Sequence, residues 1–296
     1  MKNVSVKYNK YLYRYTPVIP PTYLLSINTN QQAIKEVKVI MRNKCSIIEM
    51  DVDVVDIKTS LAVIEALSRS NAGAYVCVSN VHMCMEVFDD DRFKLIVNNA
   101  DLIIPDGRPI FWAQKLLGYK NAEQVRGQDI MAALCRVSGH KKLNIGLYGG
   151  SSNTLLEQVI SELKQSYPDI KISFNYSPPF RPHSLSEGKR IISRINDAEV
   201  DILLVGTGCP KQEIWMAEHK EKLSCVMIGV GAAFDFIAGS KNHAPKWMQR
   251  FGLEWFFRLS SEPRRLWRRY FKQNPRFIYY FARQLIKHKQ SKKIKV

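Results

Sequence analysis

Short apolar segments alternate with longer amphipathic segments from residue 45 to residue 239, and this alternation limits the possible folds more than any other feature of the sequence. Several short segments are apolar at almost every position, as expected of strands that helices cover on both faces. Strands that alternate with helices form a mostly parallel, doubly wound sheet with right-handed crossovers. We expect strands at residues 47–57, 74–79, 102–104, 143–148, 172–176, 202–205 and 225–228.

The same pattern divides the chain into three parts. Residues 1–42 are polar and interrupted by prolines, which predicts an N-terminal extension. Residues 43–240 are expected to form a Rossmann-like α/β domain, and residues 241–296 a basic, aromatic, helical appendage. Helices are expected between the strands, at residues 60–70, 129–137, 154–166, 184–196 and 212–223.

Positive charge is concentrated at the C-terminal end of the chain. The net charge is +17 at neutral pH. Residues 240–296 contain sixteen Lys and Arg and two Glu, so this segment carries +14 and the other 239 residues carry only +3. We therefore expect the C-terminal segment, rather than the whole surface, to meet an anionic partner.

Cysteine usage and the first residues limit the cellular setting. The six cysteines form no Cys-x-x-Cys pair, so neither a zinc site nor a secreted disulfide framework is predicted. No run of about 18 apolar residues occurs, and the start of the chain lacks the apolar core of a signal peptide. We expect a cytoplasmic protein with reduced thiols.

Polar residues follow two of the expected strands, at the sheet edge where α/β proteins bind their ligands. Asn80 follows the strand at residues 74–79, and Asp106 lies in a Pro-Asp-Gly turn after the strand at residues 102–104. An Asp-Gly pair is by itself a common turn signal, so this carboxylate alone is weak evidence for a site.

Glycines follow three other expected strands, as Gly149-Gly150, Gly206-Thr207-Gly208 and Gly229-Val230-Gly231. The first two pairs precede expected helices, where free backbone N–H groups and the helix N-terminus favour a phosphate. Two such ends in one sheet favour a bound anion without naming the nucleotide. The third is equally consistent with close packing of a helix against a strand.

Several motifs stand in a definite order along the chain. They are Asn80-Val81-His82, Pro105-Asp106-Gly107, Arg126-Gly127-Gln128-Asp129, Gly149-Gly150, the segment GTGCPKQE from Gly206 to Glu213, Gly229-Val230-Gly231, Gly252-Leu253-Glu254-Trp255 with Arg258, and Glu262-Pro263-Arg264-Arg265. This ordered set resembles the motifs of the WecG/TagA/CpsF glycosyltransferases. The resemblance covers roughly residues 45–270 and rests on the order and separation of many motifs.

The resemblance implies an inverting transferase that needs neither a metal nor a cofactor. Such enzymes move a sugar from UDP to a polyprenyl-diphosphate-linked sugar at the cytoplasmic membrane face. Inversion requires a base that takes the acceptor proton as the new bond forms, and the resemblance gives this role to Asp106. Asn80 would help to place substrates. Arg258, Arg265 and Arg268 would complete the site and stabilise the departing UDP.

Other positions that match the motifs are implied substrate contacts. They are Arg126, Asp129, Gly149, Gly150, Gly206, Gly208, Pro210, Gln212, Glu213, Gly229, Gly231 and Asp235. Val78 stands where the family often has threonine, so a hydroxyl role there is lost or falls to Ser79. Pro263 is expected to begin a new helix, which would place Arg258 on the preceding one.

Two Asp-x-Asp pairs, Asp51 with Asp53 and Asp89 with Asp91, have the spacing by which other nucleotide-sugar transferases hold a divalent cation. The first pair lies in an alternating strand pattern and the second in a polar turn, so we interpret both as solvated carboxylates. His82 has no partners at metal-binding spacing and is interpreted as a polar packing residue. No metal site is predicted.

The tail interleaves aromatic residues with Lys and Arg from residue 247 to residue 281. This mixture suits the headgroup region of an anionic membrane, where each surface cation contributes about 1 kcal/mol, and predicts peripheral attachment to the inner face of the cell membrane. The main alternative is a nucleic-acid-binding protein, because basic aromatic segments also bind phosphate backbones and stacked bases. No helix-turn-helix, zinc-finger or RNP signature occurs, so no nucleic acid partner is expected.

A NAD-dependent oxidoreductase is disfavoured because the chain lacks the Gly-x-Gly-x-x-Gly pattern with its acidic partner. The donor sugar stays open between N-acetylmannosamine, its uronic acid and other hexoses or hexuronates. Residues 177–181 resemble the exopolysaccharide-assembling members of the family, and Arg181 is a candidate for recognising a uronate. A homo-oligomer is also left open.

Overall fold

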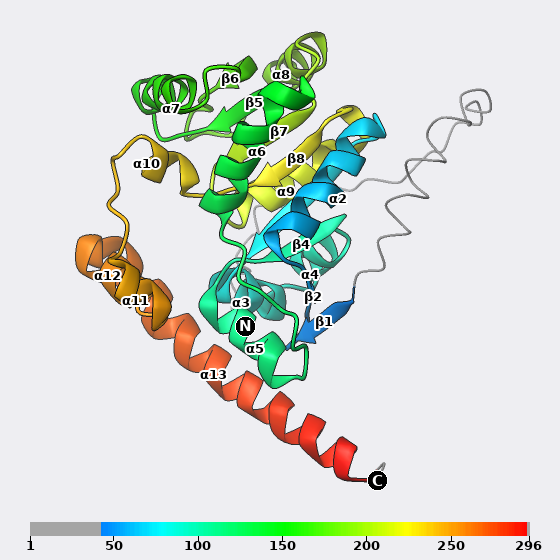
Figure 1. The fold of residues 1–296 in the computed structure, drawn as a ribbon, viewed down its shortest axis with the longest axis vertical. Helices are drawn as coiled ribbons and strands as arrows, with labels where there is room; N and C mark the ends of the chain where they lie inside the picture. Colours follow the sequence, from blue (N-terminus) through cyan, green and yellow to red (C-terminus); the bar gives the residue numbers. More distant parts are fainter. Residues whose placement is uncertain (1–42, 295–296) are drawn as a thin grey trace, which may run out of the picture.

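A computed structural model describes residues 43–294, and the predicted extension at residues 1–42 lies outside the described residues. Six strands form one sheet in the order β4-β3-β8-β7-β5-β6, and every neighbouring pair is parallel (Figure 1). The predicted α/β fold with a parallel sheet is therefore confirmed. The strands are β3 (Ala74–Ser79), β4 (Leu102–Pro105), β5 (Asn144–Gly149), β6 (Lys171–Tyr176), β7 (Ile202–Gly206) and β8 (Val226–Gly229).

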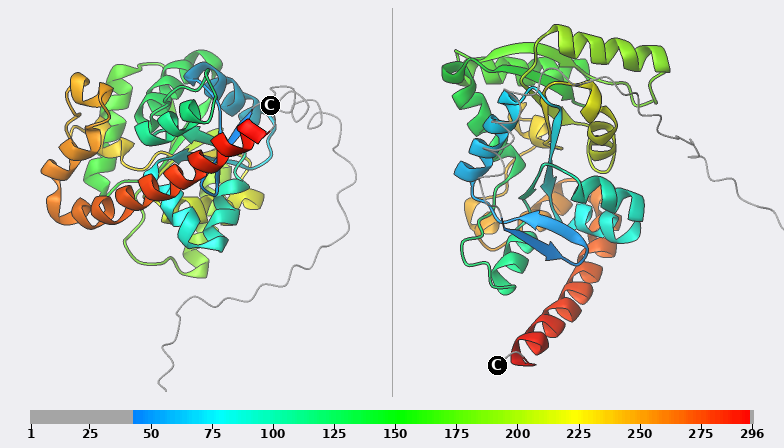
Figure 2. Two further views of the ribbon diagram at one scale, coloured as in Figure 1. Left: turned by 90° about the horizontal axis from the view of Figure 1, so that it is seen from below. Right: turned by 90° about the vertical axis from the view of Figure 1, so that its right-hand side faces the viewer.

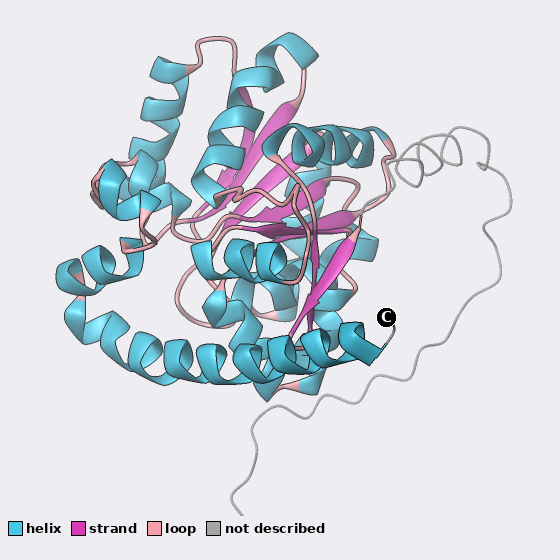
Figure 3. Ribbon diagram, turned by 60° about the horizontal axis from the view of Figure 1, so that its bottom comes forward, coloured by secondary structure: helices cyan, strands magenta, loops and turns pink. Residues whose placement is uncertain are grey.

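Helices lie on both faces of the sheet (Figure 3). All six residues of β3 are buried, and they alternate between two hydrophobic layers. Tyr75 and Cys77 enter one layer, whereas Val76 and Val78 enter the other. The helices before the C-terminal segment are α2 (Ile57–Arg69), α3 (Val81–Asp89), α4 (Asp91–Asn98), α5 (Arg108–Leu116), α6 (Gly127–Lys141), α7 (Asn153–Ser166), α8 (Leu185–Asp197), α9 (Lys211–His219) and α10 (Ala233–Ile237), with a 3-10 turn η1 (Lys220–Lys222).

The prediction of a single strand at residues 47–57 is wrong. The structure forms an antiparallel hairpin of β1 (Lys44–Ile47) and β2 (Met50–Asp53), separate from the main sheet. The chain reverses at Ile48, whose φ of 60° is unusual for a β-branched residue and is not announced by a glycine. Helix α2 begins at Ile57, because the Asp56 side chain caps it by accepting a hydrogen bond of 2.6 Å from the Thr59 N–H.

The helices of the C-terminal segment, as far as residue 294, can be followed in Figures 1 and 2. They are α11 (Lys246–Arg250), α12 (Glu254–Ser261) and α13 (Pro263–Ile294). The expected helix start at Pro263 is confirmed, and Arg258 lies on the preceding helix. None of the helices within residues 43–294 combines the length and the apolar composition that are required to cross a lipid bilayer.

Helix α13 is fastened to the rest of the fold through α3. The rings of Phe88 and Tyr280 lie 4.3 Å apart, and Arg276 Nη1 donates to Asp89 Oδ2 at 2.8 Å. Phe277 and Phe281 are buried in the same hydrophobic layer as Tyr75 and Cys77 of β3. These contacts fix which side of α13 faces the sheet and which side faces away.

The far end of α13 meets the hairpin. The Gln284 side chain accepts a hydrogen bond of 2.8 Å from the Ile48 N–H and donates one of 2.7 Å to the Ser46 carbonyl. The helix therefore runs from the carboxyl edge of the sheet, past α3, to β1 and β2. This path brings its first two turns to the edge where ligands are expected.

Candidate active site

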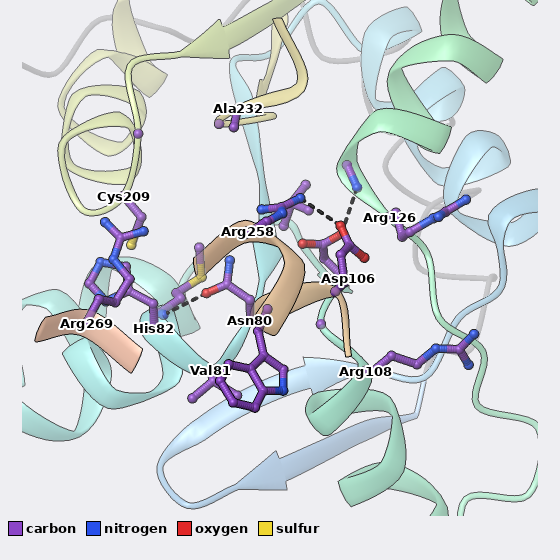
Figure 4. Close-up of a pocket in the computed structure, with 18 of the residues that line it drawn as sticks. Asn80, Val81, His82, Asp106, Arg108, Arg126, Cys209, Ala232, Arg258 and Arg269 are labelled. Atoms are coloured by element: carbon purple, nitrogen blue, oxygen red, sulfur yellow. Dashed lines mark hydrogen bonds and ion pairs between the residues drawn. The ribbon is translucent and has the colours of Figure 1, made fainter. Parts of the chain in front are cut away.

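A cavity of about 300 Å³ opens at the carboxyl ends of β3, β4 and β8. Its walls come from two sources, the loops that follow these strands and the helices α12 and α13 (Figure 4). From the strand side it is lined by Asn80, His82, Asp106, Arg108, Gln124, Arg126, Gly208, Gln212, Gly229 and Gly231, among others. From the helical side it is lined by Glu254, Trp255, Arg258, Arg265, Arg269, Tyr270, Gln273 and Asn274.

Asp106 is held firmly at the end of β4. Its own N–H donates to the Ser79 carbonyl at 2.9 Å, and its Oδ1 accepts a hydrogen bond of 3.0 Å from the Gly127 N–H. Burial raises the pKa of Asp106 to about 6, and Glu254 adds to the increase, while Arg258, the Gly127 N–H and Arg126 act against it. The carboxylate is thus ionised at neutral pH and more basic than an exposed aspartate, which suits a general base.

Asn80 stands beside Asp106 because β3 and β4 are neighbours in the sheet. It caps α3, and its Oδ1 accepts a hydrogen bond of 3.2 Å from the Met83 N–H. A Cβ atom on Gly107 would lie 3.2 Å from the Asn80 Cβ, so glycine allows the two loops to approach closely. The amide and the carboxylate therefore face one cavity, as the sequence predicts.

Arg126 and Arg258 bring positive charge close to Asp106. The Arg126 guanidinium makes two hydrogen bonds to Asp129, of 2.7 and 3.0 Å, and also contacts Gln249. Arg258 is paired with Glu254 at 2.9 Å. Two arginines beside a carboxylate can hold an anionic substrate near the base.

Helix α13 adds a second pair of arginines. Arg265 and Arg269 both line the cavity, one helical turn apart, and Arg265 pairs with Glu262. Arg268, which the sequence analysis selected, is not among the lining residues, and its guanidinium carbon lies 5.5 Å from the centre of the Trp267 ring. The structure therefore places Arg269 where Arg268 was expected.

The glycines at the strand ends separate into two groups. Gly208, Gly229 and Gly231 line the cavity, whereas Gly149, Gly150 and Gly206 do not. A Cβ atom on Gly149 would lie 2.7 Å from the backbone of Gly206, so this glycine permits close packing of β5 against β7.

Four other expected contacts also lie outside the cavity lining, namely Asp129, Pro210, Glu213 and Asp235. Asp129 holds Arg126, and Asp235 forms an ion pair of 3.2 Å with Lys241. Glu213 is fully buried beneath the lining and accepts a hydrogen bond of 2.7 Å from Gln212. The Gln212 side chain in turn accepts a hydrogen bond of 3.1 Å from the Gly208 N–H. Gln212 and Glu213 therefore support the loop at Gly208, which lines the cavity.

Two residues that line the cavity, Arg269 and His82, were not predicted as site residues from the sequence. Arg269 shares a helical face with Arg265, and the four-residue spacing is the signal that could have found it. His82 lines the cavity although it was interpreted as a packing residue. Burial and the nearby Arg269 lower the pKa of His82 to about 4, so its ring is neutral at physiological pH.

Three of the four aspartates in the Asp-x-Asp pairs contact other parts of the fold through their side chains. Asp53 is buried and accepts a hydrogen bond of 2.8 Å from the Ile103 N–H, while Asp89 binds Arg276 and Asp91 binds Lys94. The interpretation of these residues as solvated carboxylates is therefore wrong for Asp53. Across residues 43–294, no group of three His, Cys, Asp or Glu side chains has an arrangement that could hold a metal ion.

Arg181 also lies away from the cavity lining. Its guanidinium makes two hydrogen bonds to the Glu187 carboxylate, of 2.8 and 2.7 Å, at the exposed start of α8. The structure thus provides no contact between this arginine and the residues around Asp106.

Comparison with known proteins gives the same answer as the motifs. The sequence model of the family described as "Glycosyl transferase WecG/TagA/CpsF family" matches residues 45–291. The chain is 28% identical over 200 residues to the N-acetylglucosaminyldiphosphoundecaprenol N-acetyl-beta-D-mannosaminyltransferase of Bacillus spizizenii, covering 67% of this chain and 75% of that protein. The protein of the same name from Bacillus subtilis is 29% identical over 198 residues, with the same two coverages of 67% and 75%.

A third protein of that name, from Staphylococcus aureus strain MW2, is 26% identical over 226 residues, covering 76% of this chain and 86% of its own length. The family match spans both walls of the cavity, from the hairpin to α13. The chain therefore belongs to the WecG/TagA/CpsF family and is a glycosyltransferase.

Proposed function

We propose that this enzyme transfers a sugar, with inversion and without a metal, from a UDP-sugar to a sugar carried on polyprenyl diphosphate. N-Acetylmannosamine is the first donor sugar to test, because the similar proteins named above are N-acetyl-beta-D-mannosaminyltransferases. Their names also specify N-acetylglucosaminyldiphosphoundecaprenol as the acceptor. We propose an acceptor of this class here. The product enters bacterial surface or exopolysaccharide synthesis.

The observation that carries the proposal is the position of Asp106 in a cavity rich in arginine. As the acceptor hydroxyl attacks the anomeric carbon, Asp106 takes its proton, the new glycosidic bond forms and the bond from the anomeric carbon to the UDP oxygen breaks. Burial raises the pKa of Asp106 to about 6, which makes it a stronger base and still leaves it ionised at neutral pH. Asn80 lies beside it and can hydrogen-bond a sugar hydroxyl.

The departing UDP carries away negative charge, which the cavity is equipped to stabilise. Arg126, Arg258, Arg265 and Arg269 line it, and guanidinium groups bind phosphate oxygens in a bidentate manner. Ion pairs hold Arg126, Arg258 and Arg265 in place before the reaction, so little reorganisation of these charges is needed as the leaving group develops.

A single assay tests this proposal. UDP release is measured with a panel of UDP-sugars, a synthetic polyprenyl-diphosphate-linked acceptor and EDTA, for the wild type and for Asp106→Asn. Asp197→Asn is the matched control, because Asp197 is an exposed aspartate on α8 outside the cavity lining. We expect acceptor-dependent turnover that persists in EDTA, is kept by Asp197→Asn and falls by about 10²–10⁴-fold in Asp106→Asn.

Absence of turnover with every donor would contradict the proposed activity. Equal activity in the wild type and Asp106→Asn would contradict the role of the base.

The exposed side of the C-terminal helices attaches the enzyme to the anionic inner face of the cell membrane. Phe277 and Phe281 are buried against the domain, which leaves other aromatic and aliphatic residues on the outside. Outside the cavity lining, the exposed set consists of Trp247, Phe251, Phe256, Trp267, Phe271, Ile278, Tyr279 and Ile286. Apolar side chains among basic ones favour insertion at the headgroup boundary.

Cosedimentation with phosphatidylglycerol liposomes tests this attachment. We expect Phe271→Ser to weaken binding about tenfold, because a phenylalanine that is 70% exposed would no longer enter the membrane. Phe180→Ser is the control, since Phe180 is 86% exposed but lies in the loop between β6 and α8. Tight retention on single-stranded DNA together with no liposome binding would instead support the nucleic-acid alternative.

A further inference from the structure

Helix α12 brings a carboxylate, as well as an arginine, into the cavity. Glu254 and Arg258 both line it, and Glu254 Oε1 accepts a hydrogen bond of 2.9 Å from Arg258 Nη2. A carboxylate is unexpected here, because it repels the diphosphate that the cavity is proposed to bind. Its presence therefore needs a physical reason.

Arg258 is held from two sides. The Glu254 carboxylate binds one end of the guanidinium, and the guanidinium carbon lies 4.9 Å from the centre of the Phe236 ring. A cation over an aromatic face is attracted by the ring quadrupole. The Nε atom of Arg258 is buried and has no hydrogen-bond partner among residues 43–294, so a donor remains for a substrate oxygen.

Arg258 acts on Asp106 as well as on the substrate. A cation beside a carboxylate lowers its pKa and makes it a weaker base, and Arg126 and the Gly127 N–H act in the same direction. Burial opposes them by raising the pKa of Asp106, and the negative charge of Glu254 adds to that increase. Burial is the largest of these influences, and Glu254 offsets part of the effect of Arg258 on the Asp106 pKa.

We infer that Glu254 is a positioning residue of the transfer reaction, which orients Arg258 against Phe236 and balances the arginine's charge beside Asp106. The inference rests on the proposed function, in which Asp106 is the base and Arg258 binds the leaving diphosphate. The C-terminal helices then contribute to both sides of the reaction, by binding the leaving group and by keeping the base strong.

Three variants separate the two effects. Glu254→Gln keeps an oxygen for Arg258 but removes the charge, Glu254→Asp keeps the charge but shortens the side chain, and Glu254→Ala removes both. Glu65→Gln is the matched control, because Glu65 forms an i,i+4 pair with Arg69 on α2, outside the cavity lining. Its kinetic constants should equal those of the wild type.

The readouts are the pH profile of kcat/KM and the KM for the UDP-sugar. In Glu254→Gln we expect the acid limb to move down by about one pH unit, with the donor KM within about twofold of wild type. Glu254→Asp should keep the acid limb and raise the donor KM. Glu254→Ala should show both changes, with a KM increase of about tenfold.

A carbon-13 NMR titration of the Asp106 carboxyl, assigned with Asp106→Asn, measures the charge effect without any substrate. An Asp106 titration that is identical in the wild type and Glu254→Gln overturns the inference, and so does an unmoved acid limb. A lack of turnover in the wild type contradicts the proposed function instead, and the titration still decides whether Glu254 acts on Asp106.

Discussion

The two walls of the cavity are built by different means. On the strand wall, Asn80 and Asp106 follow buried parallel strands, and backbone hydrogen bonds to Ser79 fix the Asp106 loop. On the helical wall, Arg258 and Arg269 depend on the docking of α12 and α13, which side chains such as Phe281 secure. The comparison indicates that the sheet places Asp106, the proposed base, whereas tertiary packing places the arginines of α12 and α13.

The largest effect on the helical wall is expected from Arg258→Ala. Among residues 43–294, the buried Nε of this arginine has no hydrogen-bond partner, so it can donate to the substrate beside Asp106. Its loss should therefore lower kcat/KM by about 10²–10³-fold. Arg250→Ala is the control, since Arg250 is an exposed arginine on α11 outside the cavity lining. Equal kinetic constants of the two variants in the UDP-release assay would contradict a role of the helical wall in the reaction.

A smaller effect is expected from Arg269→Ala, and it sharpens the comparison because Arg268 is its sequence neighbour. Arg269 lines the cavity, so we expect a rise of about tenfold in the KM for the UDP-sugar or the acceptor. Arg268→Ala should stay within about twofold of the wild type in both constants. The reverse order of the two variants would show that α13 is rotated differently on α3 in the working enzyme.

Glu213, which supports the strand wall, is expected to affect stability rather than the rate of transfer. Burial raises the pKa of Glu213 to about 7, so the unfolded chain releases this proton at lower pH than the folded one. Stability is therefore lost as the pH rises from about 4.5 to 7, and Glu213→Gln should recover about 3 kcal/mol at pH 8 and almost none at pH 4. Urea unfolding at the two pH values measures this difference, and an equal gain at both would contradict it.

The positions of Asn80 and Asp106 on the strand wall could be predicted from the sequence. Continuous apolar runs identify buried strands, and the carboxyl ends of neighbouring parallel strands share one edge of the sheet. Asn80 and Asp106 therefore come together as expected. The separation of Gly149 and Gly206 from the cavity depends on strand order, and β5 and β7 lie on the other side of β8 from β3 and β4.

The helical wall could be predicted only in part. The sequence places arginines every three or four positions on α13, but it does not determine which face of the helix meets α3. That face is set by Gln273, Phe277 and Phe281, and Arg269 precedes them at the same four-residue spacing. The hairpin at β1 and β2 was missed for a similar reason, because Ile48 carries no turn signal and is held by Gln284 from the distant α13.

The most direct test of the account is the pH dependence of kcat/KM for acceptor-dependent UDP release by the wild type in EDTA. Because burial raises the pKa of Asp106 to about 6, we predict that kcat/KM decreases as the pH is lowered below about 6. The residual activity of Asp106→Asn should show no such decrease. A rate that is independent of pH from 5 to 8, or an acid limb that persists in Asp106→Asn, would contradict the assignment of Asp106 as the base.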